Sequence, residues 1–388
     1  MKPLPNQGRM RGFSVVELMV SVVVGLLAVM FATRLMVSSE QNKSASLGGS
    51  DSMQNGMLAL FSINTDASQA GWGLNDELVS GCNTSLADND GFQLAAVKRG
   101  AADITPLAPV VIQNNGTEPD VLSLYSGSAM SGVGSVRLKD NYAGGSVLST
   151  DSPLPFGFNR GDVVVVAPEP AGPDCSIAQV SATPDSSDLR IDASGAYRFN
   201  TGTLPTNYTG LQARVFVLGR AEKLSFHTWS IAGSTLRLRA TDLTGAAQNP
   251  QAVIDNVVSL KAQYGFDTRV GPAFTPTDGM QVTQWSSDMI DADNDLTVGS
   301  AGDFQRVAAV RIAVVARSTM PERPAAGDTT CAATPAMLTV FAGKAPASVA
   351  AAPVQVDLAV PGDPVSWTCY RYRVFETIVP IRNAGWRP

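Results

Sequence analysis

Residues 13–32 form one apolar run that contains a single charged residue, Glu17, and no proline. A helix needs about 20 such residues to cross a bilayer, so this run is long enough to span one. A carboxylate inside an apolar segment costs on the order of a few kcal/mol and is seldom there without a partner. No Lys or Arg lies within one helical turn of Glu17, so the partner must come from elsewhere.

A secretory signal peptide and a plain membrane anchor each explain less of this segment. A signal peptide ends in a small-residue cleavage site, whereas residues 28–32 contain no A-x-A pattern. A plain anchor does not call for Glu17 or for the Gly12–Phe13 junction. Basic residues precede the run, so residues 1–12 are expected on the cytoplasmic side.

The composition favours a protein outside the cytoplasm. Of 388 residues, only 16% are charged, and the formal net charge is −6. Binding to nucleic acid requires clustered Lys and Arg, which this chain lacks. We therefore expect no nucleic-acid partner.

The four cysteines, Cys82, Cys175, Cys331 and Cys369, include no C-x-x-C pair. An even number at wide spacing in an exported chain predicts two disulfides rather than metal thiolates. Three pairings are possible. We favour Cys82–Cys175 with Cys331–Cys369, because each bond would join one half of the soluble region; free buried thiols are the alternative.

Residues 35–70 are expected to continue the helix beyond the membrane, because the segment 38–46 is polar and lacks proline. Large apolar residues then recur at helical spacing: Met53, Met57, Leu60 and Phe61. This pattern predicts an apolar helix face that packs on a sheet. The glycines at positions 48, 49 and 56 are where we expect the helix to bend.

From residue 71 onward, short apolar or alternating runs are separated by Gly, Pro, Asn and Asp, which predicts β-strands. The runs are residues 121–125, 163–167, 213–218, 223–229, 235–240, 307–316 and 369–381. Residues 163–166 are all valine and predict a central strand covered on both faces.

Together these patterns predict an α+β fold with one long N-terminal helix. Its first half, residues 13–34, spans the membrane, and its second half, residues 35–70, is amphipathic. The helix packs on a large antiparallel β-rich head, residues 71–388. The head is expected to divide into two lobes near residues 205–220.

The sequence predicts that the protein is not an enzyme. His227 is the only histidine, which excludes metal sites built on several histidines, and it lies in an alternating run typical of a structural residue. No G-x-S-x-G or Walker sequence occurs. Ser/His/Asp catalysis would therefore depend on His227 without a supporting motif.

One acidic segment has the spacing of a calcium loop. Three carboxylates follow a D-x-D-x-D pattern, which can aim several oxygens at Ca²⁺: Asp291, Asp293 and Asp295. Leu296 stands where an EF-hand loop needs glycine, and Gly302 where it needs glutamate, so Asp303 would have to substitute. We expect no cofactor. Ca²⁺ is the one metal that this segment could hold, and a solvated acidic turn is the favoured alternative.

The N-terminus resembles that of type IV prepilins. The resemblance lies in Gly12-Phe13-Ser14-Val15-Val16-Glu17, followed by the apolar run. It implies that a prepilin peptidase cuts after Gly12 and that Phe13 is then methylated, so that residues 1–12 are a leader. It also implies that Glu17 pairs with the terminal amine of a neighbouring subunit.

Further blocks resemble PilW-type minor pilins: MQNG (53–56), AGWG (70–73), GC (81–82), QYGFD (263–267), RVAAVRI (306–312) and RYRVFET (371–377). The resemblance implies a pilin-like head and a minor pilin that primes pilus assembly within the tip complex. Implied partners are other minor pilins, the major pilin and a tip adhesin. The implied location is the inner membrane, in contact with its lipid and with a periplasmic head, and then the pilus, with roles such as motility and cell adhesion.

Two alternatives share part of this pattern. A pseudopilin of a type II secretion system has a similar N-terminus. A helix-anchored adhesin or carbohydrate-binding head would need an exposed tryptophan for sugar stacking, although burial is the expected state of these residues. The tryptophans are Trp72, Trp229, Trp285, Trp367 and Trp386.

Overall fold

The computed structural model describes residues 14–128, 134–153, 157–169, 174–271, 274, 279–324 and 327–385. The expected leader and the Gly12–Phe13 junction lie outside the described residues. The chain divides into two compact units, Met1–Ser50 and Asp51–Pro388. Helix α1 (Val15–Gln69) forms the described part of the first unit and the first element of the second.

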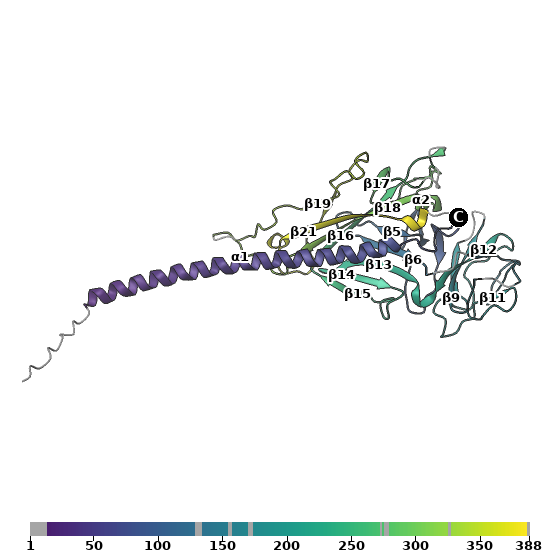
Figure 1. Cartoon of the computed structure of the whole chain (residues 1–388), viewed down its shortest axis with the longest axis horizontal. Helices are drawn as coiled ribbons and strands as arrows, with labels where there is room; N and C mark the ends of the chain where they lie inside the picture. The colour runs from purple at the N-terminus through teal and green to yellow at the C-terminus, as the bar shows by residue number, and fades with distance from the viewer. Residues whose placement is uncertain are drawn as a thin grey trace, which may run out of the picture. The chain divides into compact units, whose positions relative to one another are not determined.

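The second unit is a large β-rich body, and with the apolar N-terminal helix it confirms the expected α+β fold (Figure 1). A six-stranded sheet has the order β4 (Pro106–Leu107), β1 (Cys82–Ser85), β10 (Cys175–Gln179), β9 (Asp162–Pro168), β12 (Ala213–Arg220) and β7 (Ser135–Arg137). A five-stranded sheet has the order β15 (Gln251–Asp255), β14 (Thr235–Ala240), β13 (Ser225–Ala232), β6 (Val121–Ser126) and β5 (Val110–Gln113). A four-stranded sheet has the order β17 (Gln284–Ser286), β16 (Val257–Phe266), β18 (Val307–Arg317) and β21 (Tyr372–Pro380).

Smaller elements complete the body. Three two-stranded sheets pair β11 (Asp188–Arg190) with β8 (Val147–Ser149), β19 (Leu338–Val340) with β20 (Val354–Val356), and β2 (Val97–Arg99) with β3 (Ala102–Ile104). The short helices are η1 (Ala221–Lys223), α2 (Ala301–Gln305), η4 (Trp367–Cys369) and α3 (Arg382–Gly385). Among the strands of the described residues, β1 and β10 form the one parallel pair.

Each run expected to form a strand contains or overlaps one, and the valine run behaves as predicted. Residues 163–166 lie in β9, which pairs with β10 on one side and β12 on the other. All four valines are fully buried. Val163 and Val165 belong to one core, and Val164 and Val166 to another, because successive side chains of a strand point to opposite faces.

The chain passes from the six-stranded to the five-stranded sheet between β12 and β13. This crossing follows directly after residues 205–220, where the head was expected to divide. The two sheets do not correspond to two successive parts of the chain, because β5 and β6 come earlier in sequence but belong to the five-stranded sheet. The division into two lobes stays a prediction. Val111 and Tyr125 of these strands share a core with β9, so the two sheets are packed together.

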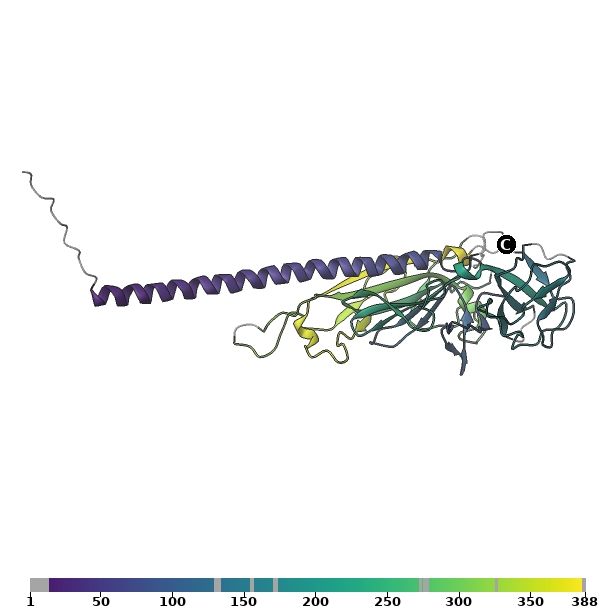
Figure 2. The same cartoon turned by 90° about the horizontal axis from the view of Figure 1, so that it is seen from below.

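The end of α1 packs on the five- and four-stranded sheets (Figure 2). Ala59, Ile63 and Ala67 are completely buried and share one hydrophobic core with residues such as Leu260 and Ile312 of β16 and β18. The helix therefore covers the core of the second unit on one side.

The helix face that packs on the body is not the predicted one. We expected Met53, Met57, Leu60 and Phe61 to pack on a sheet, but Met53, Met57 and Phe61 are exposed and Leu60 is half-buried. The buried face instead carries mostly small residues: Ser52, Gly56, Ala59, Ile63 and Ala67. At this face the Phe375 ring of β21 approaches the helix closely.

Gly56 marks that approach rather than a bend. A Cβ added at Gly56 would lie 2.1 Å from Cε2 of Phe375 on β21, which is far inside van der Waals contact. The helix continues without a break from Val15 to Gln69, so the expected weak points at positions 48, 49 and 56 do not end it.

Replacing Gly56 by Ala should destabilise the second unit. In an exposed helix Ala is favoured over Gly by about 1 kcal/mol, but here its methyl group would displace the Phe375 ring, and such overpacking costs about 1–3 kcal/mol. Chemical denaturation of the full chain should show a net loss for Gly56→Ala that is partly recovered by adding Phe375→Leu. Met57→Ala, one residue along on the exposed side, should change stability by no more than about 0.5 kcal/mol. A stabilised Gly56→Ala protein would contradict the close packing.

Candidate functional site

The start of α1 gives Glu17 a helix-capping role. Ser14 Oγ accepts a hydrogen bond from the N–H of Val16 (3.3 Å), and Glu17 Oε2 accepts one from the N–H of Ser14 (3.2 Å). The S-x-x-E spacing is that of a capping box, although Ser14 bonds the second helical residue instead of the third, and the two bonds satisfy N–H groups at the helix start that have no intrahelical acceptor. Our reading of the sequence missed this local role, although the spacing of Ser14 and Glu17 was the signal for it.

The same helix contains the stretch Val15–Met36, which is long and apolar enough to cross a membrane. It is the one such helix in the described residues, and its apolar window is not buried in the first unit. Length and composition thus agree with the predicted membrane span.

In the second unit α1 presents large apolar side chains to solvent. We call this set the outer helix face: Met53, Met57, Leu58 and Phe61. Their exposed fractions are 47%, 55%, 57% and 69%, respectively. Residues three to four apart lie on one side of a helix, so these side chains are neighbours.

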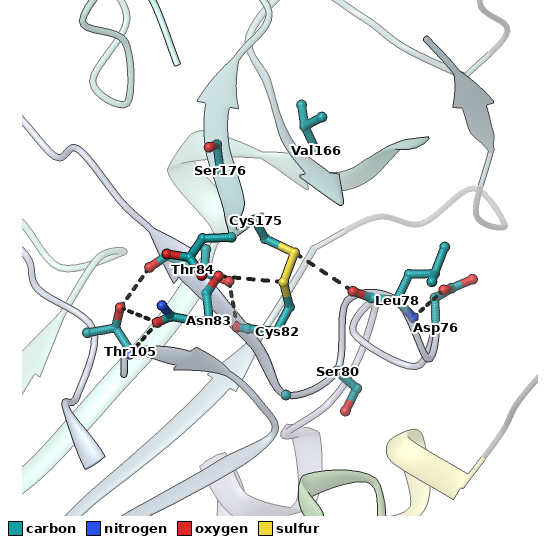
Figure 3. The surroundings of a disulfide bond; sticks show 12 residues. Asp76, Leu78, Ser80, Cys82, Asn83, Thr84, Thr105, Val166, Cys175 and Ser176 are labelled. Carbon is teal, nitrogen blue, oxygen red and sulfur yellow. Dashed lines mark hydrogen bonds between the residues drawn. A yellow bond between two sulfur atoms is a disulfide. The ribbon is translucent and has the colours of Figure 1, made fainter. Parts of the chain in front are cut away.

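Two disulfides join distant parts of the second unit, Cys82–Cys175 and Cys331–Cys369, and these are the pairs favoured from the sequence. The first lies between β1 and β10 in the six-stranded sheet (Figure 3). The second connects η4 to the segment before β19. A disulfide mainly restricts the unfolded chain, and each typically contributes about 2–4 kcal/mol.

The single histidine lies between two carboxylates. His227 on β13 is bonded through Nδ1 to Asp66 Oδ2 of α1 (2.8 Å) and through Nε2 to Asp242 Oδ1 beyond β14 (2.7 Å). Trp229 Nε1 donates to the same Asp66 oxygen (2.8 Å). These contacts fasten the last turns of the helix to the five-stranded sheet.

Electrostatics keep the imidazole of His227 protonated. Burial alone would lower its pKa, but the hydrogen bonds and charges of Asp242 and Asp66 outweigh burial and raise the pKa to about 9. Ser225 Oγ lies 3.1 Å from Nε2, as in a Ser/His/Asp arrangement. An imidazolium that donates both N–H groups to carboxylates has no lone pair with which to accept a proton from Ser225. The cluster is therefore suited to holding elements together rather than to nucleophilic catalysis.

The acidic segment forms a tight loop before α2. Carboxylate oxygens of Asp291, Asp293 and Asp303 lie within 4.8 Å of one another. Asp295 is exposed, and its Oδ1 accepts the N–H of Thr297 (2.7 Å). The structure thus brings together three of the four predicted metal ligands.

Backbone N–H groups occupy these carboxylates. Asp303 accepts four hydrogen bonds through its two carboxylate oxygens, from the N–H groups of Ala292, Asp293, Gly299 and Ser300. It also completes a capping box with Ser300 at the start of α2. Burial is the main influence on Asp303 and raises its pKa, although the N–H groups act in the opposite direction.

The departures from an EF-hand loop have structural consequences. Leu296 adopts φ +72°, the left-handed conformation for which EF-hand loops use glycine, and its side chain is exposed. A Cβ at Gly302 would lie 1.8 Å from Asp293 Oδ2, so a glutamate does not fit there without rearrangement. Calcium binding remains a prediction, beside the alternative of an acidic turn satisfied by its own backbone.

The tryptophans of the sugar-binding alternative differ in exposure. Trp229 and Trp285 are buried, Trp367 is half-buried, and Trp72 is 51% exposed. Trp386 lies outside the described residues.

Comparison with known proteins gives one family. A model described as "Type IV Pilus-assembly protein W" (PilW) matches residues 227–383. The match supports a type IV pilus-related protein. No curated protein and no solved structure matches the chain.

The segment matched by the family model contains β14 to β21 and nearly all of β13, but not the six-stranded sheet. Three of the blocks that resembled minor pilins, 263–267, 306–312 and 371–377, lie inside it, on or at the ends of the neighbouring strands β16, β18 and β21.

Replacing His227 by Gln should destabilise the protein in a pH-dependent manner. The pKa of His227 is about 9 in the folded protein, against 6.5 ordinarily. Its contribution is therefore complete below about pH 6.5 and is lost as the pH rises through about 9. We expect a deficit on the order of 2–3 kcal/mol at pH 6 that shrinks toward pH 9. Denaturation of both proteins across this range measures it, with the exposed Asp151→Asn as control. A deficit independent of pH would contradict the charged clamp.

Replacing Asp303 by Asn should also destabilise the protein, by about 2 kcal/mol, because an amide nitrogen would face backbone N–H donors. Asp295→Asn is the matched control, since Asn retains the oxygen that accepts the N–H of Thr297. Thermal unfolding of the full chain measures both variants. Equal stability of the two would show that Asp303 does not hold the loop.

Isothermal titration with millimolar Ca²⁺ distinguishes a calcium site from an acidic turn at this loop. A turn satisfied by its own backbone should give no saturable heat. Saturable heat that Asp293→Asn abolishes would instead establish a metal site.

Proposed function

We propose that this chain is a minor pilin that helps to start a type IV pilus and remains in its tip complex. In this proposal a prepilin peptidase cuts after Gly12, and Phe13 is then methylated. The helix waits in the inner membrane with the β-rich head in the periplasm. Assembly then transfers the helix from lipid into contact with the helices of other subunits.

The proposal rests on the difference between the two faces of α1. Its small residues are buried against the body, whereas the outer helix face holds large apolar residues in solvent. Contiguous exposed apolar side chains are unusual in a monomeric protein and mark interaction sites. A second apolar helix at an interaxial distance of about 8–10 Å would cover them. The PilW match over residues 227–383 supports a pilus as the setting, in preference to a secretion pseudopilin.

Glu17 supplies the register in this proposal. Its carboxylate accepts the N–H of Ser14, which is a neutral donor. A terminal ammonium group from a neighbouring subunit is a stronger partner, because charge-assisted hydrogen bonds are about twice as strong as neutral ones. Subunits that dock with the ammonium beside Glu17 are favoured over those displaced along the axis.

The activity in this proposal is assembly without chemical turnover. The protonated His227 clamp, which fastens α1 to the sheet, is in keeping with a structural role. The partners are other minor pilins, the major pilin and a tip adhesin, with no nucleic acid.

Substituting Glu17 by Ala should leave processing intact and reduce incorporation into pili by about tenfold or more, because the charged contact that sets the register is lost. Immunoblots of membranes and of sheared pili measure processing and incorporation separately. Co-fractionation with secretion components instead of pili would favour the pseudopilin alternative.

Glu17→Gln is the matched control. Its amide oxygen can still accept the N–H of Ser14, but it carries no charge. Loss of incorporation in both variants supports charge pairing. Normal incorporation of Glu17→Gln would mean that capping suffices, and would refute the pairing.

A further inference from the structure

The six-stranded sheet carries a cavity of about 360 Å³. Its lining comprises three segments, which we call the floor (Ile177 and Ala178 of β10, with Ile191), the first wall (residues 85–87) and the second wall (residues 199–205). The volume is at the small end of the range of ligand pockets, about 300–1,000 Å³. The cavity lies outside the segment matched by the pilus family, residues 227–383.

The first wall is fixed to the floor. The Cys82–Cys175 disulfide and the pairing of Ser85 with Ser176 hold β1 beside β10 (Figure 3). Residues 85–87 follow directly from this anchored strand, so the wall cannot move far from the floor.

The second wall is fixed to the first wall and to the floor. Arg198 makes a bidentate ion pair with Asp88, with Nε–Oδ1 and Nη2–Oδ2 distances of 2.6 Å, and the Asp88 side chain is fully buried. Asn200 bonds both the N–H and the C=O of Gln179 at the end of β10 (2.7 and 2.6 Å). The cavity is therefore held open by covalent, ionic and hydrogen bonds before any ligand arrives, which reduces the entropy lost on binding.

The lining favours an uncharged, apolar ligand. No charged side chain is among the lining residues, all of which the structure describes. Its polar side chains are largely engaged within the protein: Thr201 Oγ1 donates to Thr203 O (2.9 Å), and Thr203 Oγ1 lies 3.1 Å from Tyr142 Oη. The Phe199 ring is buried beneath the Arg198 guanidinium, so it offers no open face for stacking on a sugar.

The rim of the second wall offers main-chain donors. Within the part of the chain that the structure describes, the N–H groups of residues 201–203 donate no hydrogen bond. Thr201 and Thr203 are exposed. Residues 201–203 form a bend rather than an edge strand, so they could supply individual N–H donors next to the side-chain pocket but not a strand for β-pairing.

We propose that this cavity binds an extended segment of a partner polypeptide. One uncharged, apolar side chain, such as Leu, Met or Phe, enters between the two walls. Carbonyl groups of the segment accept hydrogen bonds from the N–H groups of residues 201–203. This recognition is independent of the proposed assembly through α1, and it involves residues outside the family match.

Photo-crosslinking tests the proposal with a defined probe. The full chain in lipid nanodiscs is irradiated with N-acetyl-glycyl-photoleucyl-glycinamide, whose diazirine labels adjacent residues, and the labelled peptides are mapped by mass spectrometry. We expect labels on residues 85–87 and 199–205. N-acetyl-glycyl-leucyl-glycinamide should compete for them, whereas the serine analogue and glucose should not.

Ala87→Trp should fill the cavity and reduce labelling there by about tenfold. Ala101→Trp, at an exposed hairpin turn, is the matched control and should label normally. If Ala87→Trp lowers the unfolding temperature, Ser85→Leu serves as a second filling variant. Labelling that both filling variants leave unchanged would overturn the proposal.

The competition experiment has two further outcomes that would overturn the proposal. Competition by glucose would assign the cavity to sugars. Competition by n-octanol without competition by the leucine peptide would assign it to acyl chains.

Discussion

The close approach of the Phe375 ring of β21 to Gly56 of α1 sets how the helix packs in the second unit. The Phe375 ring occupies the space that a side chain at position 56 would need, so this contact requires glycine on the helix. The approach brings Ile63 and Ala67 into the core formed by the five- and four-stranded sheets. At the end of the helix, Asp66 bonds His227 and Trp229, so a polar clamp follows the apolar seam. Packing therefore fixes the rotation of the helix, and the clamp fixes its position along the sheet.

The rotation of α1 about its axis determines which of its residues remain exposed to solvent. With the small residues turned inward, the large ones of the outer helix face are left in solvent, where each exposed apolar side chain forgoes up to about 1.5–3 kcal/mol of burial. A monomer gains nothing from this arrangement, whereas a subunit of an assembly recovers the loss on docking. In the proposed assembly the same helix would therefore serve two interfaces: the internal one of small residues, and an external one formed by the large residues of the outer helix face.

The strands were predictable because their pattern is short-range. The valine run gave a central strand, since alternate side chains of β9 enter two different cores. The packed face of α1 was not predictable in the same way. Hydrophobic periodicity assigns the greatest weight to Met57 and Phe61, while close helix–strand packing selects Gly56, which carries no hydrophobic signal at all. Asp66 and Asp242 both act through His227. His227 lies 161 positions from Asp66 in sequence, and no local pattern indicates such a contact. The capping role of Glu17 was readable from its spacing to Ser14.

The capping contact of Glu17 also lowers the cost of its carboxylate in the apolar segment. A carboxylate with no partner in an apolar environment would be expensive while the helix waits for assembly. The N–H of Ser14 lowers that cost, because it satisfies one oxygen inside the same chain. The other oxygen retains its capacity to accept, and both retain the negative charge. In the proposed assembly, a positive group from another subunit would therefore add to the cap without having to replace it, and the charge that a neutral N–H cannot neutralise would favour docking.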